Sequence, residues 1–394
     1  MAVVLVGLVA LRWLAHAVPK RVGWSFVGVA LVAFGGWNLL AWGLAPDQVH
    51  ALVGERLQYQ GLAAIFAYVV FMLSAWITVR SARRRTQFLL ATAAGGTFVA
   101  GYAIAQRAGL DPIWPTLPHD RVFSTIGQAN ALGAYLVLAI PLVVALVGRR
   151  RSTQLAAAAV VALMLAALAF TLSRGGYLGT ATTTIVMAGA LLLWRRRVAT
   201  RRRVGIAALV GIGVLVAVLT APGTRAIVQR VATRALLTAD LSESSTQIKL
   251  DLWAVGVTIA ADHPLVGVGQ DGYVLVFDEY RDQVLSPARA AHMARFRPES
   301  QHNVYLALAD GAGLPALAAY LTLVAAVGGR LIYALRTIEE PGAWLVAAAL
   351  LAAVCGHLVT DLFITAETTG SILFWTVLGI GAAMVRATGT EPAT

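Results

Sequence analysis

Three charged or titratable side chains could do chemistry at a membrane surface: two stand at the ends of apolar segments, and one lies on a helix expected in a polar segment. Arg174 lies between two apolar stretches, and two glycines follow it. Lys249 lies on an expected helix, and His302 stands where a long polar segment meets an apolar one. An arginine kept beside hydrocarbon usually has an anionic partner, and a neutral imidazole can accept a proton near pH 7. These residues are therefore typical of a site that binds an anion and holds a general base.

Each residue also has a purely structural interpretation, which the pattern alone leaves open. Arg174 could extend to a lipid headgroup, although its glycines would let a large ligand approach the backbone. Lys249 could lie on a solvated helix face, and His302 could be an interfacial polar residue at a helix start.

The composition places these residues in a membrane protein. Hydrophobic residues make up 59% of the chain and charged residues 13%, too few charges to cover a soluble protein of this length. The net charge of +12 comes largely from short arginine runs between apolar stretches, which is typical of cytoplasmic loops and argues against a nucleic-acid partner. Cys355 is the only cysteine, so no internal disulfide can form. The sequence contains no metal or nucleotide motif, and we expect no metal site and no cofactor.

The apolar stretches predict an all-α polytopic membrane protein with about eleven transmembrane helices. The expected spans are Val3–Val18, Val22–Ala45, Tyr59–Val79, Phe88–Gln106, Asn130–Val147, Gln154–Thr171, Tyr177–Trp194, Val204–Ala221, Val304–Gly328, Trp344–Thr360 and Ser371–Val385. Every basic run falls on one side if the N-terminus lies outside and the C-terminus inside.

This topology predicts three parts and one large extracytoplasmic loop. Residues 1–221 would form the first bundle, residues 222–302 a mostly helical loop module, and residues 303–394 the last three spans and a cytoplasmic tail. Within the loop, apolar spacing predicts helices at Thr224–Leu237 and Gln247–Ala261. We expect the second helix to end at Pro264.

Five short motifs occur in a fixed order along the chain. They are Ser-Thr-Ile-Gly-Gln-Ala-Asn from Ser124, Ser-Arg-Gly-Gly-Tyr-Leu from Ser173, Lys-Leu-Asp-Leu-Trp from Lys249, Asp-His-Pro-Leu-Val-Gly-Val-Gly from Asp262, and His302-Asn303 with Gly313 nine residues further on. Together they resemble the O-antigen ligase and polymerase superfamily of bacterial membrane glycosyltransferases. The resemblance covers about Ser124 to Ala316.

The resemblance implies transfer of a glycan from an undecaprenyl-diphosphate carrier to a sugar hydroxyl, without metal or nucleotide, at the outer face of the inner membrane. Arg174 matches the family's arginine that binds the carrier diphosphate. Lys249 stands where the family usually has a second arginine, and His302 matches the catalytic histidine. Direct displacement with a base on the acceptor would invert the anomeric centre.

Further residues are candidates for substrate contact. Asn303, Arg121, Arg289 and Asp361 could bind the glycan or the donor phosphates. For Asp361, and for Thr365 and Glu367 on the same last outer segment, helix capping is the alternative.

The sequence does not distinguish between three acceptors: a glycan, lipid A-core and a protein side chain. The enzyme could therefore be a ligase, a polysaccharide polymerase or a protein O-oligosaccharyltransferase. A lipid-linked glycan flippase is the alternative of another class, but a transporter is expected to place charges within its spans and to show a repeated half.

Overall fold

The computed structural model describes residues 26–384, apart from residues 57, 115–116, 148–150 and 296–297 and nearly all of 194–243. All regular structure in these residues is helical. Among them, six helices are long and apolar enough to cross a membrane, and three shorter helices are also apolar. The six are α2 (Phe26–Gly43), α5 (Ala82–Arg107), α7 (Arg151–Phe170), α8 (Arg174–Leu193), α15 (Leu314–Thr337) and α16 (Pro341–Thr360). The three are α4 (Leu62–Thr78), α6 (Ala129–Val144) and α17 (Thr368–Ala383).

These helices make the chain a multi-pass membrane protein, and each overlaps a span that the sequence predicted. The expected spans Val3–Val18 and Val204–Ala221 lie outside the described residues, as does the expected helix Thr224–Leu237. The total of eleven spans therefore stays a prediction.

The span predicted from Val304 to Gly328 is wrong in its position. The structure has a short helix there, α14 (Val304–Ala312), and α15 begins only at Leu314. Gly313 separates the two helices with φ +86° and ψ 166°, a backbone conformation that only glycine adopts readily. The apolar pattern continues across this break, so hydropathy alone could not locate it.

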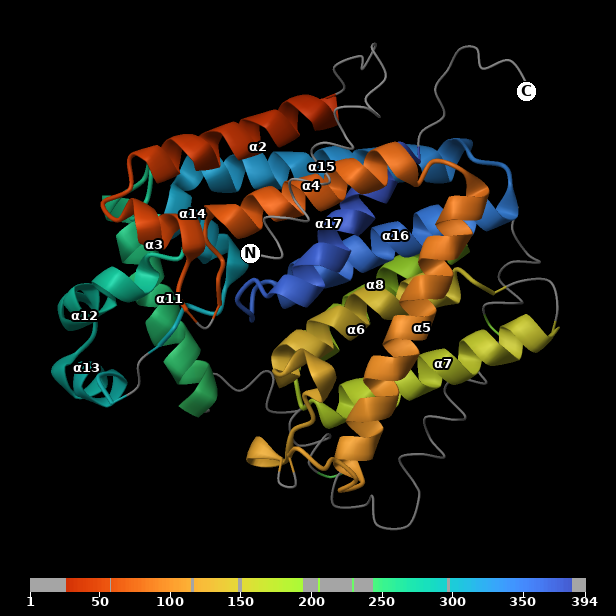
Figure 1. Ribbon diagram of the computed structural model, residues 1–394, viewed down its shortest axis with the longest axis horizontal. Helices are drawn as coiled ribbons and strands as arrows, with labels where there is room; N and C mark the ends of the chain where they lie inside the picture. The colour runs from red at the N-terminus through yellow and green to blue at the C-terminus, as the bar shows by residue number, and fades with distance from the viewer. Residues whose placement is uncertain are drawn as a thin grey trace.

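The membrane helices form two groups that share α6 and α16 (Figure 1). In one group α2 packs along α15 and α4 along α17. In the other, α5 packs against α7, and α8 against α16. The two groups have separate apolar cores, the first around Phe34, Met72 and Trp344 and the second around Leu132 and Met164.

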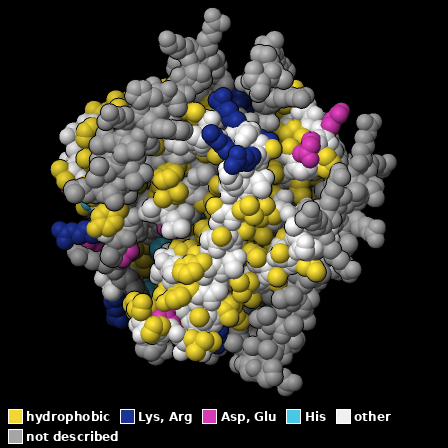
Figure 2. Space-filling view, turned by 45° about the vertical axis from the view of Figure 1, so that its right-hand side comes forward, with side chains coloured by type: hydrophobic (Ala, Val, Ile, Leu, Met, Phe, Trp, Pro, Cys, Tyr) yellow, Lys and Arg dark blue, Asp and Glu magenta, His cyan; other side chains and the backbone are white. Residues whose placement is uncertain are grey.

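Large apolar side chains also lie on the outside of the helices. Phe26, Val32, Phe98 and Ile185 are among the most exposed, and Figure 2 shows hydrophobic side chains spread over much of the described face. Such a surface is suited to lipid.

Four helices lie at one end of the bundle, and the first three of them share a separate apolar core. They are α11 (Ser244–Asp262), α12 (Tyr273–Val284), α13 (Pro287–Met293) and α14. Leu252, Val255, Ile259, Phe277 and Met293 pack together. The predicted helix before Pro264 is therefore confirmed as α11.

The segment after α11 is held against the end of α14 at very short range. Val268 N donates to Asp310 O at 2.7 Å, and Leu314 N donates to Pro264 O at 2.8 Å. A side chain at Gly267 or Gly313 would collide with the facing backbone. The glycines of two separate motifs thus allow one close backbone contact, which fixes where α14 ends.

The loop after α2 docks onto the same segment, which the sequence did not predict. This loop contains α3 (Gln48–Val53). His50 Nε2 lies 3.0 Å from Asp271 O, and Asp271 Oδ2 accepts from Glu55 N at 2.6 Å. Trp37 Nε1 on α2 also donates to Ala312 O at 3.1 Å. Helix α2 and the loop after it are therefore joined directly to α14 and to the segment that follows α11.

Candidate functional site

His302 is positioned by the turn that leads into α14. Its backbone has φ +50°, and its N–H donates to Ser300 Oγ at 3.2 Å. Its Nδ1 lies 3.2 Å from Thr365 Oγ1 and 3.5 Å from Ser300 Oγ, and these two hydroxyls also contact each other. The imidazole is therefore held at Nδ1 by two hydroxyls. One belongs to the same turn (Ser300), and the other belongs to the segment before α17 (Thr365).

Burial and a nearby cation together determine the charge of His302. Desolvation lowers its pKa to about 4, and the positive charge of Lys249 lowers it in the same direction. Both effects disfavour the imidazolium. The ring is therefore neutral at pH 7, the form that a general base requires.

Asn303 is positioned as the N-cap of α14. Its Oδ1 accepts from Tyr305 N at 3.0 Å and from Leu306 N at 3.1 Å, which satisfies donors that the first helical turn leaves open. The side chain is buried. In this structure Asn303 acts on the site by fixing the start of α14, immediately after His302.

Lys249 extends from α11 to the segment between α16 and α17. Its Nζ donates to Phe363 O at 2.9 Å and lies 5.4 Å from the centre of the Phe363 ring. Trp253, one turn along α11, packs against the same ring. The cation is thus held at the segment between α16 and α17, residues 361–367, which we name the 361–367 loop.

Arg174 begins α8 and also lies against α11. Its Nη1 donates to Thr246 Oγ1 at 2.6 Å. The next residue, Gly175, is so close to Phe363 that an added Cβ would lie 3.0 Å from Phe363 Cβ. The glycine therefore lets the start of α8 pack against the 361–367 loop.

The three residues predicted to be catalytic come together around this one loop. Arg174, Lys249 and His302 come from three separate segments, and Phe363 or Thr365 contacts each of those segments. Thr365 was a weak candidate from the sequence. Phe363, Thr246 and Ser300 were missed, because nothing in their spacing distinguishes them from other loop or helix-end residues.

Asp361 is buried at the end of α16. Tyr320 Oη donates to its Oδ2 at 3.4 Å, and His357 Nε2 lies 3.4 Å from its Oδ1. Burial raises the pKa of Asp361 to about 8, so the carboxyl is mostly protonated at pH 7. Its backbone carbonyl accepts from Val304 N at 2.9 Å, which ties the loop to the start of α14.

The other predicted substrate contacts have structural partners. Arg121 donates through Nε to Thr171 O at 2.7 Å and through Nη2 to Asn130 Oδ1 at 2.6 Å, so it supports the turn before Arg174. Glu367 caps α17 by accepting from Thr369 N at 3.0 Å.

Arg289 lies within the loop module rather than at the 361–367 loop. It forms an ion pair with Asp251, which joins α13 to α11, and donates to Gln247 Oε1 at 3.2 Å. About half of its side chain is exposed. These contacts give it a role in holding α13 on α11.

The arrangement has the parts that transfer from a diphosphate would need. Lys249 contacts the 361–367 loop at Phe363, and Arg174 donates to Thr246 on the same helix as Lys249. A neutral imidazole lies against Thr365 of this loop. Cations at a membrane surface stabilise a phosphate leaving group more strongly than cations in bulk water do. Among the described residues, no group of three or more His, Cys, Asp or Glu side chains could hold a metal ion.

Comparison with known protein families gives a match within the chain. Residues 159–321 match the family described as O-antigen ligase, and no curated protein matches the chain. The matched segment includes four of the five motifs, from Ser173 to Gly313. The superfamily predicted from the motifs is thus confirmed: over residues 159–321 this membrane protein carries the domain of the O-antigen ligase and polymerase superfamily.

Proposed function

We propose that the protein is an inverting glycosyltransferase that moves a glycan from undecaprenyl diphosphate to a sugar hydroxyl at the outer face of the inner membrane. The observation that carries this proposal is that the segments bearing Arg174, Lys249 and His302 meet at the 361–367 loop. The match to the O-antigen ligase family supports the same activity class.

In the proposed step, the acceptor hydroxyl gives its proton to Nε2 of His302 and its oxygen attacks the anomeric carbon. The bond from that carbon to the phosphate oxygen breaks, and undecaprenyl diphosphate leaves with the electron pair. Arg174 and Lys249 neutralise the charge that develops on the leaving oxygen. Attack opposite the leaving group inverts the anomeric centre.

The imidazole geometry supports this division of roles. Because Nδ1 of His302 lies against Thr365 and Ser300, Nε2 is the nitrogen available to an acceptor. An Nδ1–H that donates to Thr365 Oγ1 leaves Nε2 with a lone pair, which is the tautomer that accepts a proton.

The test uses the full-length protein in nanodiscs with a purified carrier-linked glycan and the envelope glycan acceptors of the same organism. Transfer is measured by mass spectrometry. We expect His302→Ala to lower the rate at least about a hundredfold. His292→Ala is the matched control, because His292 is an exposed histidine on α13. Equal activity of the two variants would overturn the assignment of the base.

The product separates the alternatives within the superfamily. Polymer attached to lipid A-core indicates a ligase, longer carrier-linked chains indicate a polymerase, and glycosylated Ser or Thr indicates a protein-modifying enzyme. A flippase would move the donor across the bilayer without consuming it.

A further inference from the structure

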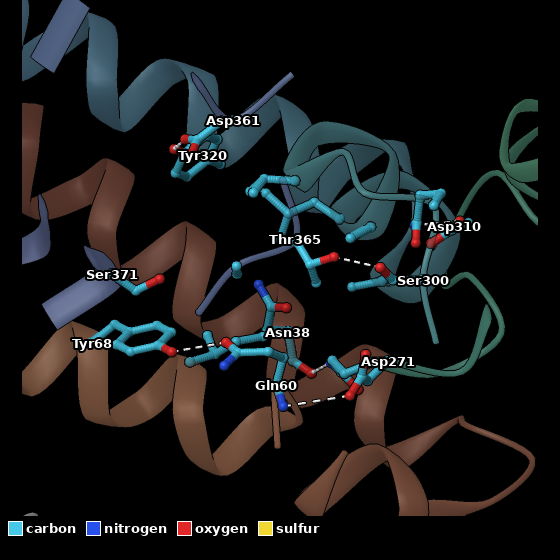
Figure 3. A pocket seen from close by; sticks show the side chains of 18 of the residues that line it. Asn38, Gln60, Tyr68, Asp271, Ser300, Asp310, Tyr320, Asp361, Thr365 and Ser371 are labelled. Atoms are coloured by element: carbon cyan, nitrogen blue, oxygen red, sulfur yellow. Dashed lines mark hydrogen bonds between the residues drawn. The ribbon is translucent and has the colours of Figure 1, made fainter. Parts of the chain in front are cut away.

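A cavity of about 90 Å³ lies beside the 361–367 loop, between the ends of several membrane helices (Figure 3). α2 contributes Asn38, α4 contributes Tyr68, and α17 contributes Ser371 and Trp375. Thr365 also lines the cavity, and it is only half-buried, so the cavity reaches the surface there. None of the residues proposed for the diphosphate lines it.

Two buried amides in this cavity have an oxygen without a partner. Asn38 is fully buried and Gln270 is 3% exposed. Asn38 Oδ1 and Gln270 Oε1 have no hydrogen-bond partner within the described part of the chain. Leaving a buried acceptor unsatisfied is unfavourable, so these two oxygens indicate a ligand that donates hydrogen bonds.

The orientation of both amides follows from their nitrogen atoms. Asn38 Nδ2 donates to Phe34 O at 2.9 Å, and Gln270 Nε2 donates to Asn38 O at 2.7 Å. Turning either amide over would place its oxygen against a carbonyl oxygen. The free groups are therefore acceptors, and the ligand must supply the donors.

The charges of the lining select a neutral ligand. Asp271, Asp310 and Asp361 contribute to the wall, and no lysine or arginine lies among the described residues of the lining. Such a wall has no lysine or arginine charge to hold a phosphate. It also offers little to a cation, because Asp271 and Asp310 already accept hydrogen bonds from Glu55 N and from Gln301 Nε2, and Asp361 is mostly protonated at pH 7.

The remaining lining is aromatic. Tyr68 and Trp375 stack with their ring centres 6.3 Å apart, and Phe34 lies against Trp375 at 5.4 Å. Apolar walls with a few well-placed hydrogen-bonding groups are typical of sites for small neutral molecules. Hydroxyls beside an apolar C–H face are the chemistry of a sugar ring.

The cavity is also connected to the proposed base. Ser300 and Thr365 line it, and both contact Nδ1 of His302. A volume of about 90 Å³ is well below the roughly 300–1,000 Å³ of sites that enclose a whole small molecule, so we expect only the edge of one sugar ring to fit inside. The rest of that ring would extend past Thr365 toward His302.

We propose that this cavity is the acceptor subsite: it takes the hydroxyl-bearing edge of one neutral sugar residue, whose hydroxyls donate to Asn38 Oδ1 and Gln270 Oε1. The 361–367 loop then lies between the two halves of the proposed site. The cations for the donor diphosphate lie near Phe363, and the acceptor sugar lies near Thr365. This inference rests on the proposed glycosyltransferase function.

Two variants test the subsite in different ways. Asn38→Leu removes an unpartnered acceptor and loses only a bond within α2. Ala307→Leu fills the cavity from α14 and removes no hydrogen-bonding side chain. Thr322→Val is the matched control, because Thr322 makes the same kind of bond within α15, to Ala318 O, on an exposed surface.

The experiment measures binding and turnover separately in full-length protein in nanodiscs. The probe for binding is the phosphate-free oligosaccharide that mild acid releases from the cell envelope of the source organism. Its binding to the protein is measured by calorimetry. We expect each cavity variant to weaken its binding, and to raise the acceptor KM, about tenfold. The donor KM and the thermal midpoint should stay unchanged, as in Thr322→Val.

The two proposals can fail independently. Wild-type transfer combined with unchanged acceptor binding in a folded Asn38→Leu or Ala307→Leu protein would overturn the subsite and leave a cavity filled by water alone. Weakened binding in those variants, with no transfer by the wild type, would support the subsite and overturn the transferase. His302→Ala should keep the binding and lose the transfer.

Discussion

Nδ1 of His302 lies 3.2 Å from Oγ1 of Thr365, although 63 residues separate them in the sequence. Thr365 Oγ1 also contacts Ser300 Oγ, which accepts from the backbone N–H of His302. The two hydroxyls thus hold both the backbone and the ring of the histidine. Thr365 acts through His302, as a positioning residue for the proposed base.

Replacing Thr365 by valine keeps its shape and removes the hydroxyl. We expect kcat to fall about tenfold or more, because the ring loses the partner that selects its tautomer. Thr365→Ser should restore most of the rate. The measurement is steady-state transfer with both substrates varied, and equal kcat values for Val and Ser would contradict the positioning role.

The pKa of His302 sets the pH range of the free enzyme. Because burial and Lys249 lower it from 6.5 to about 4, the neutral base is already fully populated at pH 6. We expect the acid limb of kcat/KM near pH 4 and not near 6.5. Lys249→Met should move that limb upward, because it removes a repelling positive charge. A limb that stays in place would show that Lys249 does not act on His302.

Much of this site could be predicted from the sequence. The sequence places Arg174 and His302 at the ends of apolar segments and Lys249 on a helix. A charged side chain kept beside hydrocarbon usually has a function or an anionic partner, so these positions could be selected as candidates. The loop that joins them could not be predicted. Phe363 acts through its backbone carbonyl and its ring, and Ser300 through one hydroxyl, and such roles leave no pattern in spacing.

In the fold as well, some features could be predicted from the sequence and others could not. Apolar runs predicted the helices that cross the membrane, because burial in lipid depends on the length and hydropathy of a local segment. The break at Gly313 and the docking of His50 onto Asp271 depend on contacts between distant segments. The cavity depends on four or more helices at once, so no single stretch of sequence contains it.

Asp361 makes stability depend on pH. Its pKa is about 8 in the folded protein against an ordinary value of 3.8, so the folded state binds more protons between these values. Stability from this group is complete below about pH 4 and is lost as the pH rises to 8. Between pH 6.5 and 8.5 we expect the thermal midpoint of the wild type to fall. Asp361→Asn should remove that slope, because the amide resembles the protonated acid, and a slope that persists in Asp361→Asn would contradict this assignment.

Gly313 should be the most sensitive glycine of the α14–α15 break. An alanine there would have to keep φ +86° and ψ 166°, which costs about 1–3 kcal/mol, and its Cβ would collide with Leu265 O. We expect Gly313→Ala to destabilise the protein by at least about 3 kcal/mol. Gly328→Ala is the matched control on α15, where an added Cβ meets nothing within 4 Å, and it should be neutral or stabilising. Thermal unfolding in detergent compares the two. Because the collision at the end of α14 would displace this short helix, and with it His302 at the other end, transfer by any folded Gly313→Ala protein should also fall. Similar midpoints for both variants would show that the break tolerates a side chain.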